Sequence, residues 1–121
     1  MADRQRLPAE RTSITHRFEI GGLKGYVTVG LYPDGRPGEL FIRVPKTGTI
    51  EQGLCNAVGI LCSMCLQAGV PLADIVAKFK NTRFEPSGWA AIGGEKHFAT
   101  SILDYIFRWL EVRFLGTNQA R

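Results

Sequence analysis

The sequence predicts an α+β domain, with an N-terminal antiparallel sheet of three or more strands followed by two to three C-terminal helices. Three observations predict it: alternating apolar and polar residues in the N-terminal part, short turns between those segments, and helical apolar spacing from Thr49 onward. The 121 residues are 45% apolar and 21% charged, which suits one globular domain. We therefore expect a flexible arm over 1–12, a single folded domain over 13–116 and a tail over 117–121.

The predicted sheet consists of three short segments with strand-like alternation: 13–20, 25–32 and 39–44. Gly21-Gly22 supplies the positive φ angles of a tight reversal, and Pro33-Asp34-Gly35 is a strong turn signal. Pro45 stops the third segment. Because a parallel connection needs a crossover of about a dozen residues, these strands are predicted to form an antiparallel meander.

The remaining chain supplies helices to cover that sheet. The first opens at Thr49, with Gln52 completing a capping box, and Gly69 is placed to end it. Pro71 begins a shorter second helix, and Gly116 closes the last one. The predicted ranges are 49–68 and 71–80 for the first two helices, 81–96 for a long loop, and 97–115 for the last helix.

The last helix is apolar around most of its circumference, apart from a narrow stripe of Asp104, Arg108 and Glu111. One interpretation is a crowded core. The favoured interpretation is a subunit interface, because large exposed apolar patches mark association, so we predict a homo-oligomer (a dimer or a trimer of dimers) through this helix. Asp104 and Arg108, four residues apart, are interpreted as an ion pair, which has little energetic value if it is exposed.

Several function classes are disfavoured. Cys55, Cys62 and Cys65 lie among apolar residues of a helix, so we interpret them as small buried side chains rather than a redox or zinc site. No catalytic motif is found, and we expect no enzyme activity, cofactor or metal. The odd cysteine count and the absence of a signal or membrane segment predict a cytoplasmic protein. The net charge of +4 is spread singly, which argues against binding a nucleic acid polymer.

The loop at 82–89 is the candidate ligand site. It combines two aromatic rings, a guanidinium and a hydroxyl, the groups that bind a nucleobase and its phosphates. We predict Phe84, Arg83 and Ser87 as ligand-binding residues, together with Arg108 from the last helix. The alternative is a structural loop that places Phe84 and Trp89 in the core.

Long stretches of the chain resemble the TSCPD domain, which occurs near the C-terminus of adenosylcobalamin-dependent (class II) ribonucleotide reductases. The stretches that carry the resemblance are LPAERTSITHRF (7–18), IGGLKGYVTVGLY (20–32), DGRPGELFI (34–42), GVPL (69–72), KF (78–79), TRFEPSG (82–88) and DYIFRWL (104–110). The catalytic barrel of the reductase does not fall within these 121 residues, so its chemistry is not transferred.

The chain also resembles small phage proteins that counter the Thoeris defence by sequestering cyclic ADP-ribose signals, some of which also hold cyclic oligonucleotides. This resemblance implies a symmetric oligomer with pockets at subunit interfaces, in which Phe84 stacks on the ligand and Arg108 contacts it. An asparagine of those pockets has no counterpart, because 91–94 reads AIGG.

The leading hypothesis is a non-catalytic protein that sequesters a cyclic nucleotide signal, in the host cytoplasm if a phage encodes it. The alternative is an accessory or regulatory module of an adenosylcobalamin-dependent ribonucleotide reductase. A third possibility is a structural domain with neither ligand nor partner.

Overall fold

The computed structural model describes residues 4–45 and 48–116, and it confirms the predicted α+β class. Two compact units divide the chain: one holds 1–18 and 24–71, the other 19–23 and 72–121. The second unit thus includes the turn between the first two strands. The predicted tail over 117–121 lies outside the described residues.

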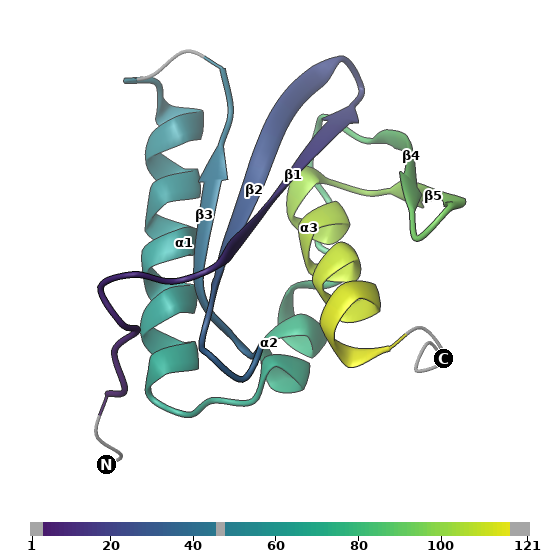
Figure 1. Cartoon of the computed structure of the whole chain (residues 1–121). Helices are drawn as coiled ribbons and strands as arrows, with labels where there is room; N and C mark the ends of the chain where they lie inside the picture. The colour runs from purple at the N-terminus through teal and green to yellow at the C-terminus, as the bar shows by residue number, and fades with distance from the viewer. Residues whose placement is uncertain (1–3, 46–47, 117–121) are drawn as a thin grey trace. The chain divides into compact units, whose positions relative to one another are not determined.

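The first unit is built on a three-stranded antiparallel sheet, as predicted (Figure 1). Its strands, β1 (Ser13–Ile20), β2 (Leu23–Leu31) and β3 (Pro37–Arg43), follow each other in spatial order β1-β2-β3. The ends of β1 and β2 at their shared turn belong to the second unit. One side of the strands is buried and includes Phe18, Val27, Val29, Leu40 and Ile42.

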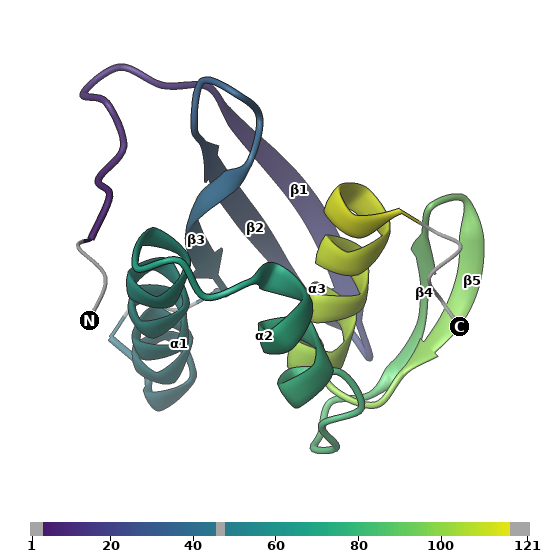
Figure 2. The same ribbon diagram turned by 90° about the horizontal axis from the view of Figure 1, so that it is seen from below.

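Helix α1 (Ile50–Gln67) runs alongside β3, as Figures 1 and 2 show. It begins as predicted, because the Thr49 side chain accepts a hydrogen bond from the Gln52 backbone N–H at 3.2 Å. The Gln52 side chain reaches the edge of β3. There its Oε1 accepts from the Val44 N–H at 2.7 Å, and its Nε2 donates to the Ile42 carbonyl at 2.9 Å.

Two further side chains of α1 bond to the same strand edge. The Leu40 N–H donates to the Ser63 hydroxyl at 2.9 Å, and Gln67 Nε2 donates to the Gly38 carbonyl at 3.0 Å. An exposed strand edge is a template for unwanted pairing, and α1 covers this one with polar groups at three heights. Gly59 lets the helix approach closely, because a Cβ built there would lie 2.6 Å from the Leu40 carbonyl oxygen.

The arm predicted over 1–12 forms no helix or strand within its described part. It is nevertheless attached to the first unit by several hydrogen bonds. The Gln5 N–H donates to the Gln67 carbonyl at 2.7 Å, and the Leu31 N–H donates to the Thr12 carbonyl at 2.9 Å. Arg11 also pairs with both carboxylate oxygens of Glu39, at 2.7 and 2.9 Å.

The second unit contains helices α2 (Leu72–Phe79) and α3 (Ile102–Leu110), followed by a π-helical turn, η1 (Glu111–Leu115). The prediction of a helix from residue 97 is wrong, because Ser101 caps α3 by accepting from the Asp104 N–H at 3.0 Å. The end is as predicted: Gly116 has φ +88°. Most apolar side chains of α3 are buried in the single chain: Ile102, Tyr105, Ile106, Phe107, Trp109 and Leu110, whereas Leu103 is partly exposed.

The prediction of a loop over 81–96 is also wrong, since much of this segment forms a β-hairpin (Figure 2). Strand β4 (Gly88–Ile92) runs antiparallel to β5 (Glu95–Ala99). Gly93 and Gly94, with φ of +60° and +86°, form the two-residue turn that matches the twist of a hairpin. Apart from Trp89 and Phe98, these two strands show little alternation of large apolar and polar residues, so the sequence does not indicate them.

Candidate functional site

The sequence-predicted site residues Arg83, Phe84, Ser87 and Arg108 all fall in the second unit. The Phe84 ring is 40% exposed and Trp89 is 65% exposed, so the alternative that buries both rings in the core is wrong. The Phe84 N–H donates to the Thr100 carbonyl at 3.0 Å, which fixes its backbone. Ser87 bonds to a neighbour in its own loop, because its backbone N–H donates to Glu85 Oε1 at 3.2 Å.

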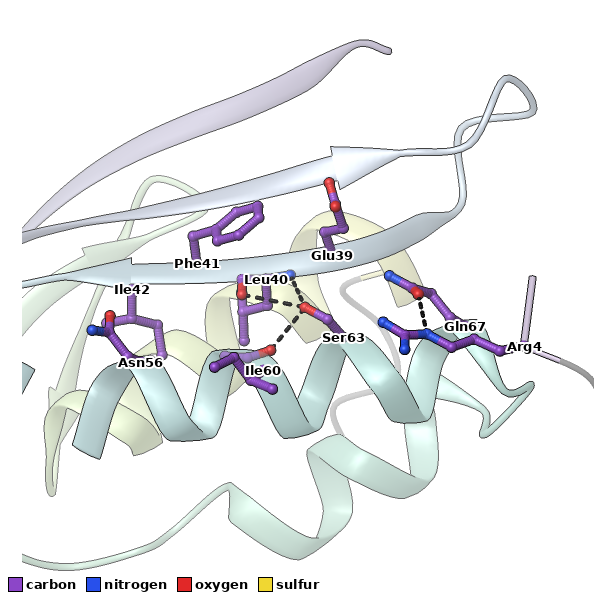
Figure 3. Close-up of a pocket in the computed structure, with 10 residues that line it drawn as sticks. Arg4, Glu39, Leu40, Phe41, Ile42, Asn56, Ile60, Ser63 and Gln67 are labelled. Atoms are coloured by element: carbon purple, nitrogen blue, oxygen red, sulfur yellow. Dashed lines mark hydrogen bonds between the residues drawn. The ribbon is translucent and has the colours of Figure 1, made fainter. Parts of the chain in front are cut away.

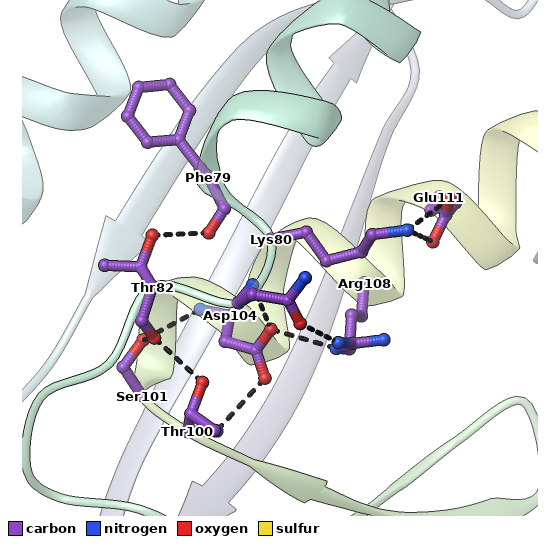
Figure 4. A network of polar contacts seen from close by, with 9 residues as sticks. Phe79, Lys80, Thr82, Thr100, Ser101, Asp104, Arg108 and Glu111 are labelled. Carbon is purple, nitrogen blue, oxygen red and sulfur yellow. Dashed lines mark hydrogen bonds and ion pairs between the residues drawn. The ribbon is translucent and has the colours of Figure 1, made fainter.

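Arg108 is held in a polar network around Asp104, shown in Figure 4. The Asp104 carboxylate is fully buried and accepts three hydrogen bonds: from the Asn81 N–H at 2.6 Å, the Thr100 N–H at 3.0 Å and Arg108 Nε at 2.9 Å. Arg108 Nη2 also donates to the Asn81 side chain. The predicted ion pair of Asp104 and Arg108 is therefore confirmed, but its carboxylate is buried and its guanidinium only partly exposed.

This network joins three segments that are distant in sequence. The Thr82 carbonyl accepts from the hydroxyls of Thr100 at 2.9 Å and Ser101 at 2.7 Å. Asn81 has φ +76°, a left-handed conformation that is costly for a residue with a side chain, and its bond to Asp104 helps to hold it there. The network thus fixes where the loop leaves α2 and where α3 begins.

Arg108 also lines a hollow of about 290 Å³, but not with the predicted loop residues. Its walls are Ile92, Gly93, Glu95, His97, Arg108, Glu111 and Val112. Two carboxylates face this hollow, and Glu111 already pairs with Lys80 Nζ at 3.0 Å. An anionic ligand is disfavoured there, because Glu95 and Glu111 oppose the single guanidinium. The ligand roles of Arg83, Phe84, Ser87 and Arg108 remain predictions.

The first unit carries a different cluster that the sequence analysis did not single out. A groove of about 400 Å³ runs between β3 and α1, lined by Arg4, Glu39, Leu40, Phe41, Ile42, Asn56, Gly59, Ile60, Ser63 and Gln67 (Figure 3). Phe41 and Glu39 project from the same side of β3 in this view, while Ser63 bonds to the Leu40 backbone. Arg4 is held by Gln67 Oε1 at 2.7 Å.

A second hollow of about 380 Å³ adjoins this groove through Phe41, Ile42 and Asn56. Its lining consists of Thr15, Tyr26, Thr28, Phe41, Ile42, Arg43, Gln52 and Asn56. Tyr26 and Phe41 are 46% and 54% exposed, although they lie on central and edge strands of the sheet. The sheet thus presents aromatic rings and a guanidinium on its open side.

This open side follows from strand alternation. Val27 and Val29 point to the buried side, so Tyr26 and Thr28 point the other way, and Phe41 and Arg43 do the same on β3. The alternation was visible in the sequence. What it did not reveal was that Tyr26 and Phe41 stay about half exposed on this side.

The third feature is the exposed face of α1. Ile50, Leu54, Leu61 and Met64 are large apolar side chains in contact with solvent, at spacings of three, four and seven residues. This spacing is the one that produces an apolar seam between helices. The sole charged residue of α1 is Glu51, so charge repulsion does not protect the face from association.

Two of the three cysteines of α1 are buried, as predicted. Cys55 and Cys62 are buried and Cys65 is partly exposed, and none forms a disulfide. Burial raises the pKa of Cys55, with a smaller contribution from Glu51, and burial together with Cys65 raises the pKa of Cys62 to about 12. A thiol that remains protonated at neutral pH is a poor nucleophile and metal ligand.

We therefore expect iodoacetamide near neutral pH to modify Cys65 first and Cys62 last. The thiolate is the reacting species, so the rate at Cys62 should keep rising as the pH approaches about 12. Peptide mapping by mass spectrometry at increasing times measures the order, and protein unfolded in urea is the control in which all three react alike. Early modification of Cys62 in the folded protein would contradict this assignment.

Among the described residues, no group of three or more histidine, cysteine, aspartate or glutamate side chains is close enough together to hold a metal ion. Among the helices of 4–45 and 48–116, none combines the length and apolar character that crossing a bilayer requires.

The fold and the site define a small α+β module with a helix-covered sheet edge and a buried carboxylate network. The profile of the TSCPD domain matches residues 3–114, and the chain belongs to this family. This confirms the resemblance to the TSCPD domain of the class II reductases.

Three relatives show where such a segment occurs. The vitamin B12-dependent ribonucleotide reductase of Rhodopirellula baltica is 49% identical over 115 residues, which are 95% of this chain and 11% of that enzyme. The corresponding enzyme of Streptomyces coelicolor is 46% identical over 112 residues, covering 93% and 12%, and that of Agrobacterium fabrum is 42% identical over 116 residues, covering 96% and 9%. The chain therefore spans about a tenth of these curated relatives. No solved structure matched the chain.

Proposed function

We propose that this chain is a non-catalytic module that docks onto the catalytic part of an adenosylcobalamin-dependent ribonucleotide reductase. The observation that carries the proposal is the alignment: nearly the whole chain corresponds to one contiguous segment of enzymes named as such reductases. The same relatives give no support to the hypothesis of cyclic nucleotide sequestration, which stays a prediction from the sequence.

The chemistry of the described residues supports a non-catalytic role. Two of the three thiols lie buried in α1, and the Cys62 thiol with a pKa of about 12 is protonated at neutral pH. The buried carboxylate of Asp104 is satisfied by three donors and holds a loop and a helix end. These groups stabilise the fold, and their geometry leaves them little freedom to react.

The exposed face of α1 supports docking. Leu54, Leu61 and Met64 would lose apolar surface to a partner, and each Å² of apolar surface removed from water contributes about 25 cal/mol. The remainder of a reductase, about nine tenths of the relatives' length, is the occupant we propose for this face, because the aligned segment exists beside it in those enzymes.

A domain replacement tests the proposal. The Rhodopirellula baltica reductase is prepared without its matching segment, and this chain is then supplied, either fused in its place or as a separate protein. We expect association, seen by co-elution in size-exclusion chromatography, and recovery of ribonucleotide reduction at least in the fusion. If the folded chain gave neither association nor recovery, this result would contradict the proposal.

Paired variants locate the docking face. Leu54→Lys with Leu61→Lys places two charges on the exposed stripe of α1 and is expected to abolish co-elution, because buried unpaired charges are costly at an interface. Val70→Lys is the matched control, since Val70 is exposed and apolar but lies beyond the end of α1. Equal co-elution of both variants would place the contact elsewhere.

A further inference from the structure

We propose that the hollow on the open side of the sheet in the first unit binds a single nucleotide. Its base would lie against Tyr26 and Phe41, and its phosphate would bind Arg43. The inference is independent of docking to a reductase, because it rests on residues of β2, β3 and α1 that wall one hollow of about 380 Å³.

The two aromatic rings form the base-binding part. In the register of β2 and β3, Tyr26 pairs with Arg43 and Thr28 pairs with Phe41, so the rings are diagonal neighbours on one side of the sheet. Both are about half exposed. An aromatic ring in a strand ordinarily packs against a neighbour, and a ring left open to solvent offers its π-face to a planar base.

The guanidinium of Arg43 forms the phosphate-binding part. Three of the six arginines in the first unit are held by protein groups: Arg4 by Gln67, Arg11 by Glu39 and Arg36 by Asp34. Within the described part of the chain, Arg43 has no such hydrogen bond or ion pair, although it lines the hollow. Its planar fork of donors matches the geometry of phosphate oxygens.

Asn56 adds an oriented donor from α1. Its side-chain oxygen accepts from Gln52 Nε2 at 2.6 Å, so its amide nitrogen is turned away from that contact. Gln52 is itself held by the Val44 N–H and the Ile42 carbonyl at the edge of β3. Asn56 is thus positioned before a ligand arrives, which lowers the ordering cost of binding.

The size and charge of the hollow favour one nucleotide over a strand of nucleic acid. About 380 Å³ is within the range of small-molecule sites, which starts near 300 Å³. A polymer would need a continuous basic track along the sheet. On the same side of β3, the position two residues before Phe41 is instead the acidic Glu39, whose carboxylate is already paired with Arg11.

Calorimetric titration of the full chain tests the site, with ATP, AMP, adenosine and inorganic tripolyphosphate as probes. We expect ATP and AMP to bind, and adenosine and tripolyphosphate to bind more weakly than ATP, because each satisfies only half of the site. Phe41→Ala and Arg43→Gln are each expected to raise the Kd for ATP about tenfold. Far-UV circular dichroism and thermal unfolding check that both variants fold. If Phe41→Ala does not fold, the Kd of Arg43→Gln alone tests the site.

The second unit provides matched controls. Phe98→Ala and Arg113→Gln remove an exposed ring and an exposed guanidinium of the same kinds outside both candidate sites, and the Kd for ATP should be unchanged. Phe84→Ala and Arg83→Gln report on the rival loop. The proposal is overturned if no probe binds at millimolar concentration, or if ATP or cyclic ADP-ribose binds through Phe84 and Arg83 and not through Phe41 and Arg43. Much tighter binding of a deoxythymidine decamer than of ATP would overturn the single-nucleotide assignment.

Discussion

Replacing Asp104 with alanine is expected to lower the free energy of unfolding by about 3–5 kcal/mol, the cost typical of breaking a buried charged network. The carboxylate is fully buried and accepts from two backbone N–H groups and from Arg108. Alanine would leave these donors without their acceptor and would release Asn81 from its left-handed conformation. The effect is large because one side chain joins the end of α2, the loop and the start of α3.

Urea unfolding followed by circular dichroism measures this loss, and Arg108→Ala is the control. Arg108 is partly exposed and its removal leaves Asp104 with both backbone donors, so we expect a loss of only about 1 kcal/mol. The loss for Asp104→Asn should lie between these two losses, because the amide oxygen still accepts a hydrogen bond but the amide nitrogen cannot. Asp104→Asn replaces Asp104→Ala in the comparison if the alanine variant does not fold. Equal losses for Asp104→Ala and Arg108→Ala would contradict this account.

Two glycines of α1 are expected to respond to alanine with opposite signs. At Gly59 a Cβ would lie 2.6 Å from the Leu40 carbonyl oxygen, a backbone atom that cannot move aside cheaply. Gly59→Ala must push α1 away from β3 and weaken the Ser63 bonds to Leu40, so we expect a loss of about 1–3 kcal/mol. At Gly53 no atom beyond its chain neighbours and the surrounding helix backbone lies within 4 Å of the new Cβ, and Gly53→Ala should stabilise the protein by about 0.5–1 kcal/mol.

Thermal and urea unfolding of the two single variants compare them directly. Both replace glycine by alanine in one helix, so helix propensity contributes similarly and the difference reports the close approach of α1 to the strand edge. If Gly59→Ala proved as stabilising as Gly53→Ala, α1 would not pack on the edge of β3 as described.

Sequence patterns predicted the sheet and the first helix well. Alternation placed all three strands, and the short turns required an antiparallel order, because chain length alone forbids a parallel connection there. Thr49 and Gly69 bounded α1 because capping depends on neighbouring residues. The sequence predicts the second half less well: it indicates a loop around Gly93-Gly94, where the structure has a hairpin turn, and a helix from residue 97, where Ser101 caps α3.

The candidate site divides in the same way. Phe84 and Arg83 were found because they lie close together in the sequence, and the exposure of Phe84 agrees with a ligand-facing loop without testing it. Tyr26, Phe41, Arg43 and Asn56 come from three elements, and their common hollow arises from strand pairing and from the position of α1. Arg108 was expected to face a ligand, but its guanidinium bonds to Asp104 and Asn81.

By itself, the sequence determined the strand faces, the caps of α1 and the family, since each depends on residues near one another in the chain or on their order. Only the tertiary structure decided that Gln52, Ser63 and Gln67 satisfy the edge of β3, and that Asp104 is a buried acceptor and not a surface charge. The physical reason is that the sequence does not show whether a polar side chain hydrogen-bonds to water or to a distant backbone group. Only folding brings that backbone group within hydrogen-bond distance.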